Sequence, residues 1–104
     1  MNPLSMNPLE IMKQAKELND RLQEQMGQMR IEASAGGGMV TVVLNGHKQA
    51  QQVTIDPEVV SKDDVEMLQD LIAAALNHAV RKVDEELKRN VGGLMGGLSI
   101  PGLT

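Results

Sequence analysis

A single β-hairpin pattern stands in the middle of a chain whose other periodic segments are helical. Residues 36–60 are GGGMVTVVLNGHKQAQQVTIDPEVV, in which a Val-rich run is followed by Asn45-Gly46, the strongest short-range hairpin signal. Asp56-Pro57 ends the return strand. A hairpin alone is marginally stable in water, so other elements must cover it. The fold is therefore constrained to helices packed on a small sheet.

The sequence predicts a three-stranded antiparallel meander around this hairpin. Gly36-Gly37-Gly38 supplies a flexible turn before the Val-rich strand. In the return strand, Val53 and Ile55 are two residues apart and share a face. The three strands are predicted at residues 30–35, 39–44 and 49–55, followed by one helical turn at 57–60.

A long helix is predicted before the sheet, at about residues 7–29. Asn7 suits the N-cap, Pro8 the first helical position, and Glu10 the acid of a capping box. Apolar residues then recur every three or four positions, which is typical of one stripe on a helix. We interpret this stripe as packing surface for the core or for a second copy of the chain. Its members are Ile11, Ala15, Leu18, Leu22, Met26 and Met29.

A second long helix is predicted after the sheet, with Ser61 as its cap and Lys88-Arg89 at its end, where cations suit the helix dipole. One apolar stripe runs along it, made of Val65, Leu68, Ile72, Ala75, Ala79, Val83 and Leu87. A second stripe contains Met67, Leu71, Ala74, Leu76 and Val80. A helix that is apolar on two sides is buried on two sides. Because its own sheet covers only one, we infer that a second copy covers the other.

Composition limits the rest. At 104 residues the chain is one domain, with a disordered start at 1–6, the folded domain at 7–90 and a Gly-rich flexible tail at 91–104. It has no aromatic residue and no Cys, which excludes base-stacking platforms, disulfides and thiolate metal sites. It has no membrane-spanning apolar run and no secretory signal, so we expect a soluble, cytoplasmic protein.

The charge is distributed unevenly. The net charge is −4, but the excess acid is concentrated in residues 56–70. Helices of about 23 and 29 residues are roughly 35 and 43 Å long, against roughly 20 Å for a six-residue strand. Both helices should therefore overhang the sheet they pack on, with the start of the first and the end of the second together at a projecting tip. Their cations are the predicted DNA-binding residues: Lys13, Lys16, Arg21, Arg81, Lys82, Lys88 and Arg89.

These cations have a second interpretation. Those on the first helix have an acid four residues away, as do Arg81 and Lys82 on the second, so a solvated, self-paired helix face is the alternative to phosphate contact. Lys88 and Arg89 are followed by no acid within the helix and are expected to be the freest.

The remaining polar groups predict no metal site, no cofactor and no enzyme activity. His47 has no second His nearby in sequence and no Cys partner. His78 is expected on the helix surface, with contact to a phosphate or base as the alternative. Gly36-Gly37-Gly38 lacks the Lys-Ser/Thr of a phosphate loop and precedes a strand. No Ser has a base placed by local spacing. Asp63, Asp64, Glu66 and Asp70 lack the spacing of a calcium loop and are interpreted as a solvated first helical turn.

The order of motifs resembles a known family. A helix IMKQAKELNDRLQEQM, a Gly-rich turn, VTVVLNG, VTIDP, the helix EMLQDLIAAALNHAVRKVDEEL and a Gly/Leu/Pro tail together resemble the YbaB/EbfC family of nucleoid-associated DNA-binding proteins. The likeness covers about residues 8–103. It implies an α+β fold of long helix, three-stranded meander and long helix, assembled as a tweezer-like homodimer that holds DNA between helical arms, in the bacterial or plastid nucleoid. Sequence preference in the family is weak or variable.

The sequence therefore leads to one main hypothesis and two alternatives. The main hypothesis is a homodimer that contacts the phosphates of double-stranded DNA with little base reading. The first alternative is a dimeric protein-interaction module without direct DNA binding, and the second is a subunit whose exposed helix faces are completed by a different chain. The predicted dimer interface comprises Val42, Leu44, Met67, Leu68, Leu71, Ala75 and Leu76.

Overall fold

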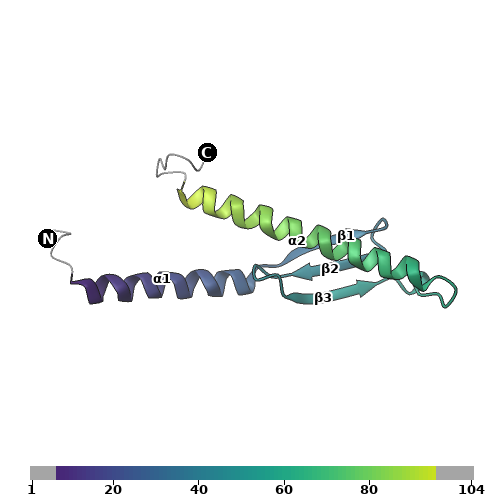
Figure 1. Ribbon diagram of the computed structural model, residues 1–104, viewed down its shortest axis with the longest axis horizontal. Helices are drawn as coiled ribbons and strands as arrows, with labels where there is room; N and C mark the ends of the chain where they lie inside the picture. Colours follow the sequence, from purple (N-terminus) through teal and green to yellow (C-terminus); the bar gives the residue numbers. More distant parts are fainter. Residues whose placement is uncertain (1–6, 96–104) are drawn as a thin grey trace.

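The computed structural model describes residues 7–95, with side chains through residue 90. The order of elements is α1 (Pro8–Gln28), β1 (Ile31–Ala35), β2 (Val40–Leu44), β3 (Ala50–Ile55), the 3₁₀ helix η2 (Pro57–Val59) and α2 (Val65–Met95). The predicted α+β class and order of elements are confirmed. The molecule is elongated, 71 × 27 × 15 Å, and α1 and the end of α2 point in the same direction from the sheet (Figure 1). No helix in the described part is long and apolar enough to cross a bilayer.

The sheet is the predicted antiparallel meander, in the order β1-β2-β3. Val42, on the central strand, is opposite Ala33 on one side and Val53 on the other. Val40 is likewise opposite Ile55, so Val53 and Ile55 lie on one face of the sheet, together with Val40 and Val42, as predicted. The turn between β1 and β2 contains three consecutive glycines with positive φ, a conformation that side chains disfavour.

The hairpin at Asn45 forms, but its glycine has an unexpected role. The left-handed residue of the turn is Lys48, at φ +62°, and not Gly46. Gly46 is instead buried against the end of α1, where an added Cβ would lie 2.8 Å from the Met26 carbonyl oxygen and 2.8 Å from the Met29 sulfur. Glycine is needed at this position for close approach of two backbones.

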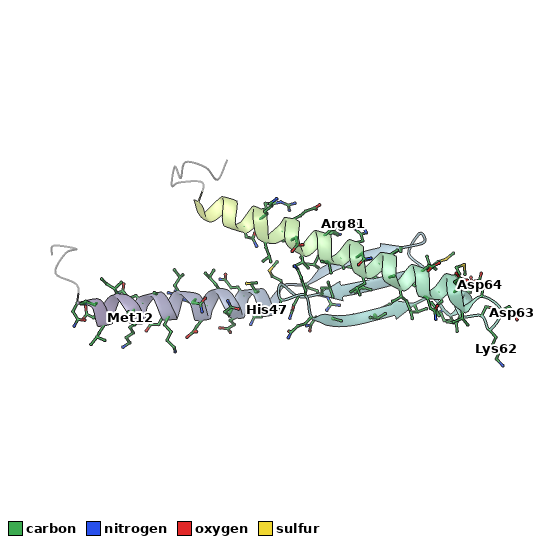
Figure 2. The ribbon with its side chains drawn as sticks, in the orientation of Figure 1. Met12, His47, Lys62, Asp63, Asp64 and Arg81 are labelled. Carbon is green, nitrogen blue, oxygen red and sulfur yellow. The ribbon has the colours of Figure 1, made fainter. Side chains whose placement is uncertain are left out.

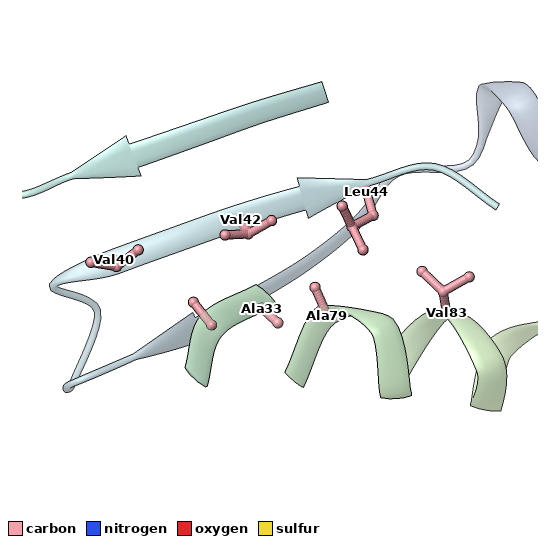
Figure 3. Close-up of a cluster of buried hydrophobic side chains, with 7 residues drawn as sticks. Ala33, Val40, Val42, Leu44, Ala79 and Val83 are labelled. Atoms are coloured by element: carbon pink, nitrogen blue, oxygen red, sulfur yellow. The ribbon is translucent and has the colours of Figure 1, made fainter. Parts of the chain in front are cut away.

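The core lies between α2 and one face of the sheet. Ala75, Ala79 and Val83 of α2 have no exposed surface and pack over β1 and β2, whose buried members on this face are Ala33, Val40, Val42 and Leu44 (Figure 3). The spacing of four residues along α2 places these side chains on one stripe, as the sequence predicts. Alanines on this stripe allow the helix to approach the sheet closely. A core of only small and branched side chains follows from the absence of aromatic residues.

The ends of α2 differ from the prediction. The helix begins at Val65, and its cap is Asp64, whose Oδ1 accepts a hydrogen bond from the Met67 N–H at 3.1 Å. Ser61 forms a local turn instead, with its Oγ accepting from Asp63 N–H at 3.2 Å. The helix also continues past Lys88 and Arg89 to Met95, because glycines are tolerated in a helix at a cost of about 1 kcal/mol each. The predicted disordered start and the rest of the predicted tail lie outside the described residues.

The first helix differs most from the prediction made from the sequence. Its N-cap is Asn7, as predicted, with Oδ1 accepting from Leu9 N–H at 2.7 Å and Glu10 N–H at 3.3 Å. However, α1 has no buried residue and packs lengthwise on no other described element. The prediction that both helices pack on the sheet is therefore wrong for α1. The chain passes from α1 into β1 through only two extended residues, so the helix projects away from the sheet (Figure 1).

Candidate nucleic-acid interface

Two helical segments project from one end of the sheet. α2 runs from the end of β1 toward its start. His78 Nδ1 is 3.3 Å from Ser34 O, and one turn later Lys82 Nζ donates to Glu32 O at 2.7 Å. One further turn brings the helix to the start of the strand, and the part after Glu86 extends beyond it. We call α1 and this last part of α2 the two arms. They project toward the same end, as predicted, but they diverge and do not pack along each other (Figure 1).

The three predicted cations on α1 are all exposed. Lys16 Nζ is 3.5 Å from Asp20 Oδ2, and both side chains are largely exposed, so the pair is weak. The two other pairings expected on this helix, Lys13 with Glu17 and Glu17 with Arg21, are not among the ion pairs of the described residues. Lys13 and Arg21 thus form no ion pair within the described part of the chain.

The four predicted cations on α2 are in different situations. Arg81 is exposed on the part of α2 that precedes the arm (Figure 2). Lys82 donates to a β1 carbonyl oxygen and does not pair with Glu86. Lys88 is exposed on the arm. Arg89 is not free, because its guanidinium donates to Glu86 Oε2 at 2.9 Å. The expectation of a free Arg89 considered only acids that follow it, whereas residues three positions apart in either direction are neighbours on a helix.

A pocket lies between the start of β1 and α2. Its volume is about 330 Å³, and it is lined by Arg30, Ile31, Glu32, Lys82, Glu85, Glu86 and Arg89. Arg30 was not among the predicted site residues, because it falls at the junction between a helix and a strand, where periodicity carries no signal. Its guanidinium donates to Gln52 Oε1 at 2.8 Å, across the sheet. Three cations and three carboxylates line the pocket, so its charge is balanced.

The acidic stretch lies at the other end of the molecule. Asp63 and Asp64 are found at the start of α2, far from Met12 on α1 (Figure 2). Asp64 caps the helix, and its negative charge is stabilised by the positive end of the helix dipole. The acidic excess of residues 56–70 is thus distant from the arms, although α1 itself carries four carboxylates against three cations. This placement agrees with the expectation from sequence.

The described residues form no candidate metal site. They contain no group of three or more His, Cys, Asp or Glu side chains that could hold a metal ion. His78 is on the surface of α2 against β1, and His47 Nε2 is 3.1 Å from the Gln23 carbonyl oxygen of α1. Both imidazoles are thus engaged with backbone carbonyl oxygens.

The predicted dimer-interface residues differ in how much surface they expose. Val42, Leu44 and Ala75 are at most 1 % exposed in the single chain, so they have no surface to offer a second copy. Leu71 is half-buried against the β1–β2 turn, where a Cβ on Gly36 would lie 2.7 Å from it. The remaining members are on the surface or partly on it: Met67, Leu68 and Leu76.

An apolar surface remains beside β3. Leu76 lies two helical turns before Asp84, which contacts the β2–β3 turn, so it is on the β3 side of α2. It is 41 % exposed, and Val53 on β3 is 50 % exposed. Within β3 only Ile55 is partly buried, because α2 covers β1 and β2 but leaves the third strand open.

These features define a class of protein: a small α+β scaffold with two projecting, cation-bearing helices and an uncovered apolar flank. Residues 4–98 match the model of the YbaB/EbfC DNA-binding family. The chain belongs to this family.

Individual relatives agree with this assignment. The chain is 53 % identical over 93 residues to a nucleoid-associated protein of Koribacter versatilis, covering 89 % of this chain and 92 % of the relative. It is 52 % identical over 97 residues to a nucleoid-associated protein of Acetivibrio thermocellus, covering 89 % and 86 %. The crystal structure of an uncharacterized protein from Helicobacter pylori has the same fold, with a TM-score of 0.70 at 25 % identity, covering 86 % of this chain and 98 % of that one.

Proposed function

We propose that this protein is a nucleoid-associated, DNA-binding homodimer that contacts duplex phosphates with its helical arms. The observation that carries the proposal is the arrangement of charge on the arms: exposed cations on two projecting helices, with the acidic stretch at the opposite end (Figure 2). Membership of the YbaB/EbfC DNA-binding family supports it. The names of the relatives support a location at the nucleoid.

Phosphate contact suits these arms better than base reading. Lysine and arginine side chains on an exposed helix can neutralise phosphates without entering a groove. The chain has no aromatic residue to stack on a base. Few free cations and a net charge of −4 predict modest affinity with a marked salt dependence.

The uncovered flank supports the homodimer. Val53 and Leu76 are exposed beside a strand whose outer edge is unpaired within the described chain. Exposed apolar surface next to an open edge strand promotes association with another chain. A second copy would cover this surface and bring two pairs of arms into one assembly.

The test is fluorescence anisotropy of a labelled DNA duplex titrated with protein over a salt series. Protein concentration is taken from peptide absorbance, because the chain has no aromatic residue. Lys88→Ala removes one exposed cation from an arm, and Lys62→Ala removes one exposed cation from the acidic end, as a matched control. We expect Lys88→Ala to weaken binding and to flatten the log–log salt slope by about 0.9 for each phosphate that is no longer neutralised, and Lys62→Ala to leave the slope unchanged. Equal effects of the two variants would contradict phosphate contact by the arms.

A protein-interaction module remains the second candidate, because α1 exposes apolar side chains. Leu9 is 74 % exposed and Met12 is 67 % exposed, and neither contributes to phosphate binding. Such a helix face can bind another amphipathic element. Absence of a DNA anisotropy change at low salt, together with a protein partner whose binding does not depend on salt, would favour this candidate.

A further inference from the structure

The turn between β2 and β3 contacts both helices that carry the arms. On one side it meets the end of α1, where the Gly46 N–H donates to Met26 O at 2.7 Å and the His47 Nε2 is 3.1 Å from Gln23 O. Met26 O is one of the last four carbonyls of the helix, and it otherwise accepts from the Met29 N–H at 3.3 Å, a donor that it shares with Gln25 O. The turn therefore caps α1 from outside, with two backbones in close contact.

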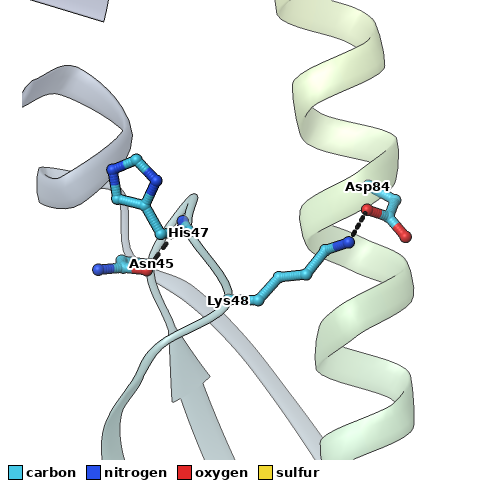
Figure 4. Close-up of polar contacts among 4 residues, drawn as sticks. All are labelled: Asn45, His47, Lys48 and Asp84. Atoms are coloured by element: carbon cyan, nitrogen blue, oxygen red, sulfur yellow. Dashed lines mark hydrogen bonds and ion pairs between the residues drawn. The ribbon is translucent and has the colours of Figure 1, made fainter. Parts of the chain in front are cut away.

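On its other side the same turn reaches α2. Lys48 Nζ is 2.7 Å from Asp84 Oδ1, just before the arm of α2 begins (Figure 4). The two side chains are 44 % and 55 % exposed, so this link is weaker than the backbone contact with α1. Consecutive residues thus point to different arms: His47 toward α1 and Lys48 toward α2.

The turn is itself held in one conformation. Asn45 is 2 % exposed, and its Oδ1 accepts from His47 N–H at 2.9 Å and Gln49 N–H at 3.0 Å. Its Nδ2 donates to Gln49 Oε1 at 2.9 Å. This buried amide satisfies the turn internally and sets the directions in which His47 and Lys48 leave it.

The arm formed by α1 has little other support. Within the described chain it packs lengthwise on nothing, and beyond its covalent link to β1 its polar contacts with the rest of the described fold are those with Gly46 and His47. A change at this junction is amplified along a helix of about 31 Å. The direction of the arm is therefore decided where α1 meets the turn.

We propose that Gly46, His47 and Lys48 are positioning residues that set the separation of the two arms. The proposal rests on the proposed function, since it assigns to these residues the width of the space in which DNA would be held. Gly46 fixes the direction of α1 by close backbone contact. Lys48, through Asp84, limits the movement of α2 relative to the same turn.

The separation can be measured without DNA. The chain has no Cys, so Gln14→Cys and Asn90→Cys supply unique spin-label sites on the exposed faces of the two helices. Labelled chain is diluted with excess unlabelled chain, so that pulsed dipolar spectroscopy reports distances within one chain. Circular dichroism melting of each variant is recorded in parallel.

Two variants with matched controls test the two sides of the turn. Gly46→Ala places a Cβ 2.8 Å from Met26 O, whereas in Gly27→Ala, at the same junction, the nearest atom is His47 Cδ2 at 3.9 Å. Asp84→Asn removes the ion pair, whereas Glu85→Gln removes the same charge next to it from a residue that forms no ion pair among the described residues. Asp84→Glu keeps the carboxylate and serves as the conservative rescue.

We expect Gly46→Ala to shift the mean distance by several ångströms and Asp84→Asn to broaden the distribution. Gly27→Ala, Glu85→Gln and Asp84→Glu should retain the distribution of the parent chain. If Gly46→Ala does not fold, His47→Ala replaces it, with a broadened distribution as the expected result. Unchanged distributions in both folded test variants would overturn the proposal.

DNA binding of the same variants separates this proposal from the proposed function. A decrease of at least about threefold in affinity for Gly46→Ala, with no decrease for Gly27→Ala, supports both. A changed distance between the arms with unchanged DNA affinity would support the positioning role of the turn. The same result would contradict the idea that DNA binding depends on the separation of the arms. A parent chain that does not bind DNA would overturn the proposed function while the distances still decide the role of the turn.

Discussion

The two long helices have similar amphipathic patterns and different structural roles. The α2 stripe supplies Ala75, Ala79 and Val83 to the core, each with no exposed surface. The α1 stripe contributes no buried residue, and Ile11 and Leu18 on it are each more than half exposed. Periodicity therefore identifies a helix and its apolar side, but it does not say what covers that side. Within one chain, α2 packs on one face of the sheet, and no described element packs along α1.

The largest expected effect tests this difference directly. Leu44 is 1 % exposed under α2, so Leu44→Ala should lower the free energy of unfolding by about 3–5 kcal/mol, because burial is reduced and a cavity remains. The equivalent change on α1, Leu18→Ala, should cost less than about 0.5 kcal/mol. Urea denaturation followed by circular dichroism measures both. A comparable destabilisation by Leu18→Ala would mean that α1 is covered in solution.

The next effect concerns the exposed side of α2. If a second copy covers Leu76, then Leu76→Asp places a carboxylate in an apolar contact and should weaken the dimer by about 2–3 kcal/mol, roughly 30- to 150-fold. Leu9→Asp, on α1, is the control and should leave the dimer intact. Sedimentation equilibrium reports the association constant. A dimer of unchanged strength in Leu76→Asp would place the interface elsewhere.

The helix caps allow a smaller comparison. Removing the α2 cap by Asp64→Ala should lower global stability by about 1 kcal/mol, because α2 is part of the core. Removing the α1 cap by Asn7→Ala should fray the start of that helix with no change in the main transition, because α1 projects from the core. Hydrogen exchange of individual amides distinguishes the two. Equal decreases in global stability would show that α1 unfolds together with the core.

The smallest effect is expected on the surface of α1. Lys16 and Asp20 form an exposed pair at 3.5 Å, so Asp20→Asn should change the free energy of unfolding by no more than a few tenths of a kcal/mol. The change should, however, release Lys16 and raise affinity for DNA at low salt. Fluorescence anisotropy of the labelled duplex measures that affinity. Weaker DNA binding after removal of this acid would contradict a role for Lys16 at a phosphate.

Local patterns account for most of the secondary structure. The Val-rich run and Asn45-Gly46 predicted the hairpin, and Asn7-Pro8 predicted the start of α1. The start of α2 was misplaced by three residues, because Ser61 and Asp64 are both good caps and the helix uses the later one. Ser and Asp have similar preferences for the N-cap position, so the local sequence does not show which of the two begins the helix.

The candidate site was only partly predictable. The sequence identified exposed cations on both helices and separated them from the acids at residues 56–70. It did not show that Glu86 holds Arg89, that Lys82 binds the β1 backbone, or that Arg30 lines the same pocket. The last two depend on which side of α2 faces β1, and this rotation is set by packing against the sheet. The Glu86–Arg89 pair, in contrast, lies within α2 at a spacing of three residues, which local sequence contains.

The sequence by itself determined the family, the order of helices and strands and the apolar stripes, because these depend on residue types at short spacing. The tertiary structure decided which stripe becomes core and which helix projects. It also decided that Gly46 serves close approach rather than a left-handed turn. The physical reason is that burial and backbone contact are properties of pairs of elements: a stripe is buried only if a complementary face is free to receive it, and α2 has taken the face that the sheet offers within one chain.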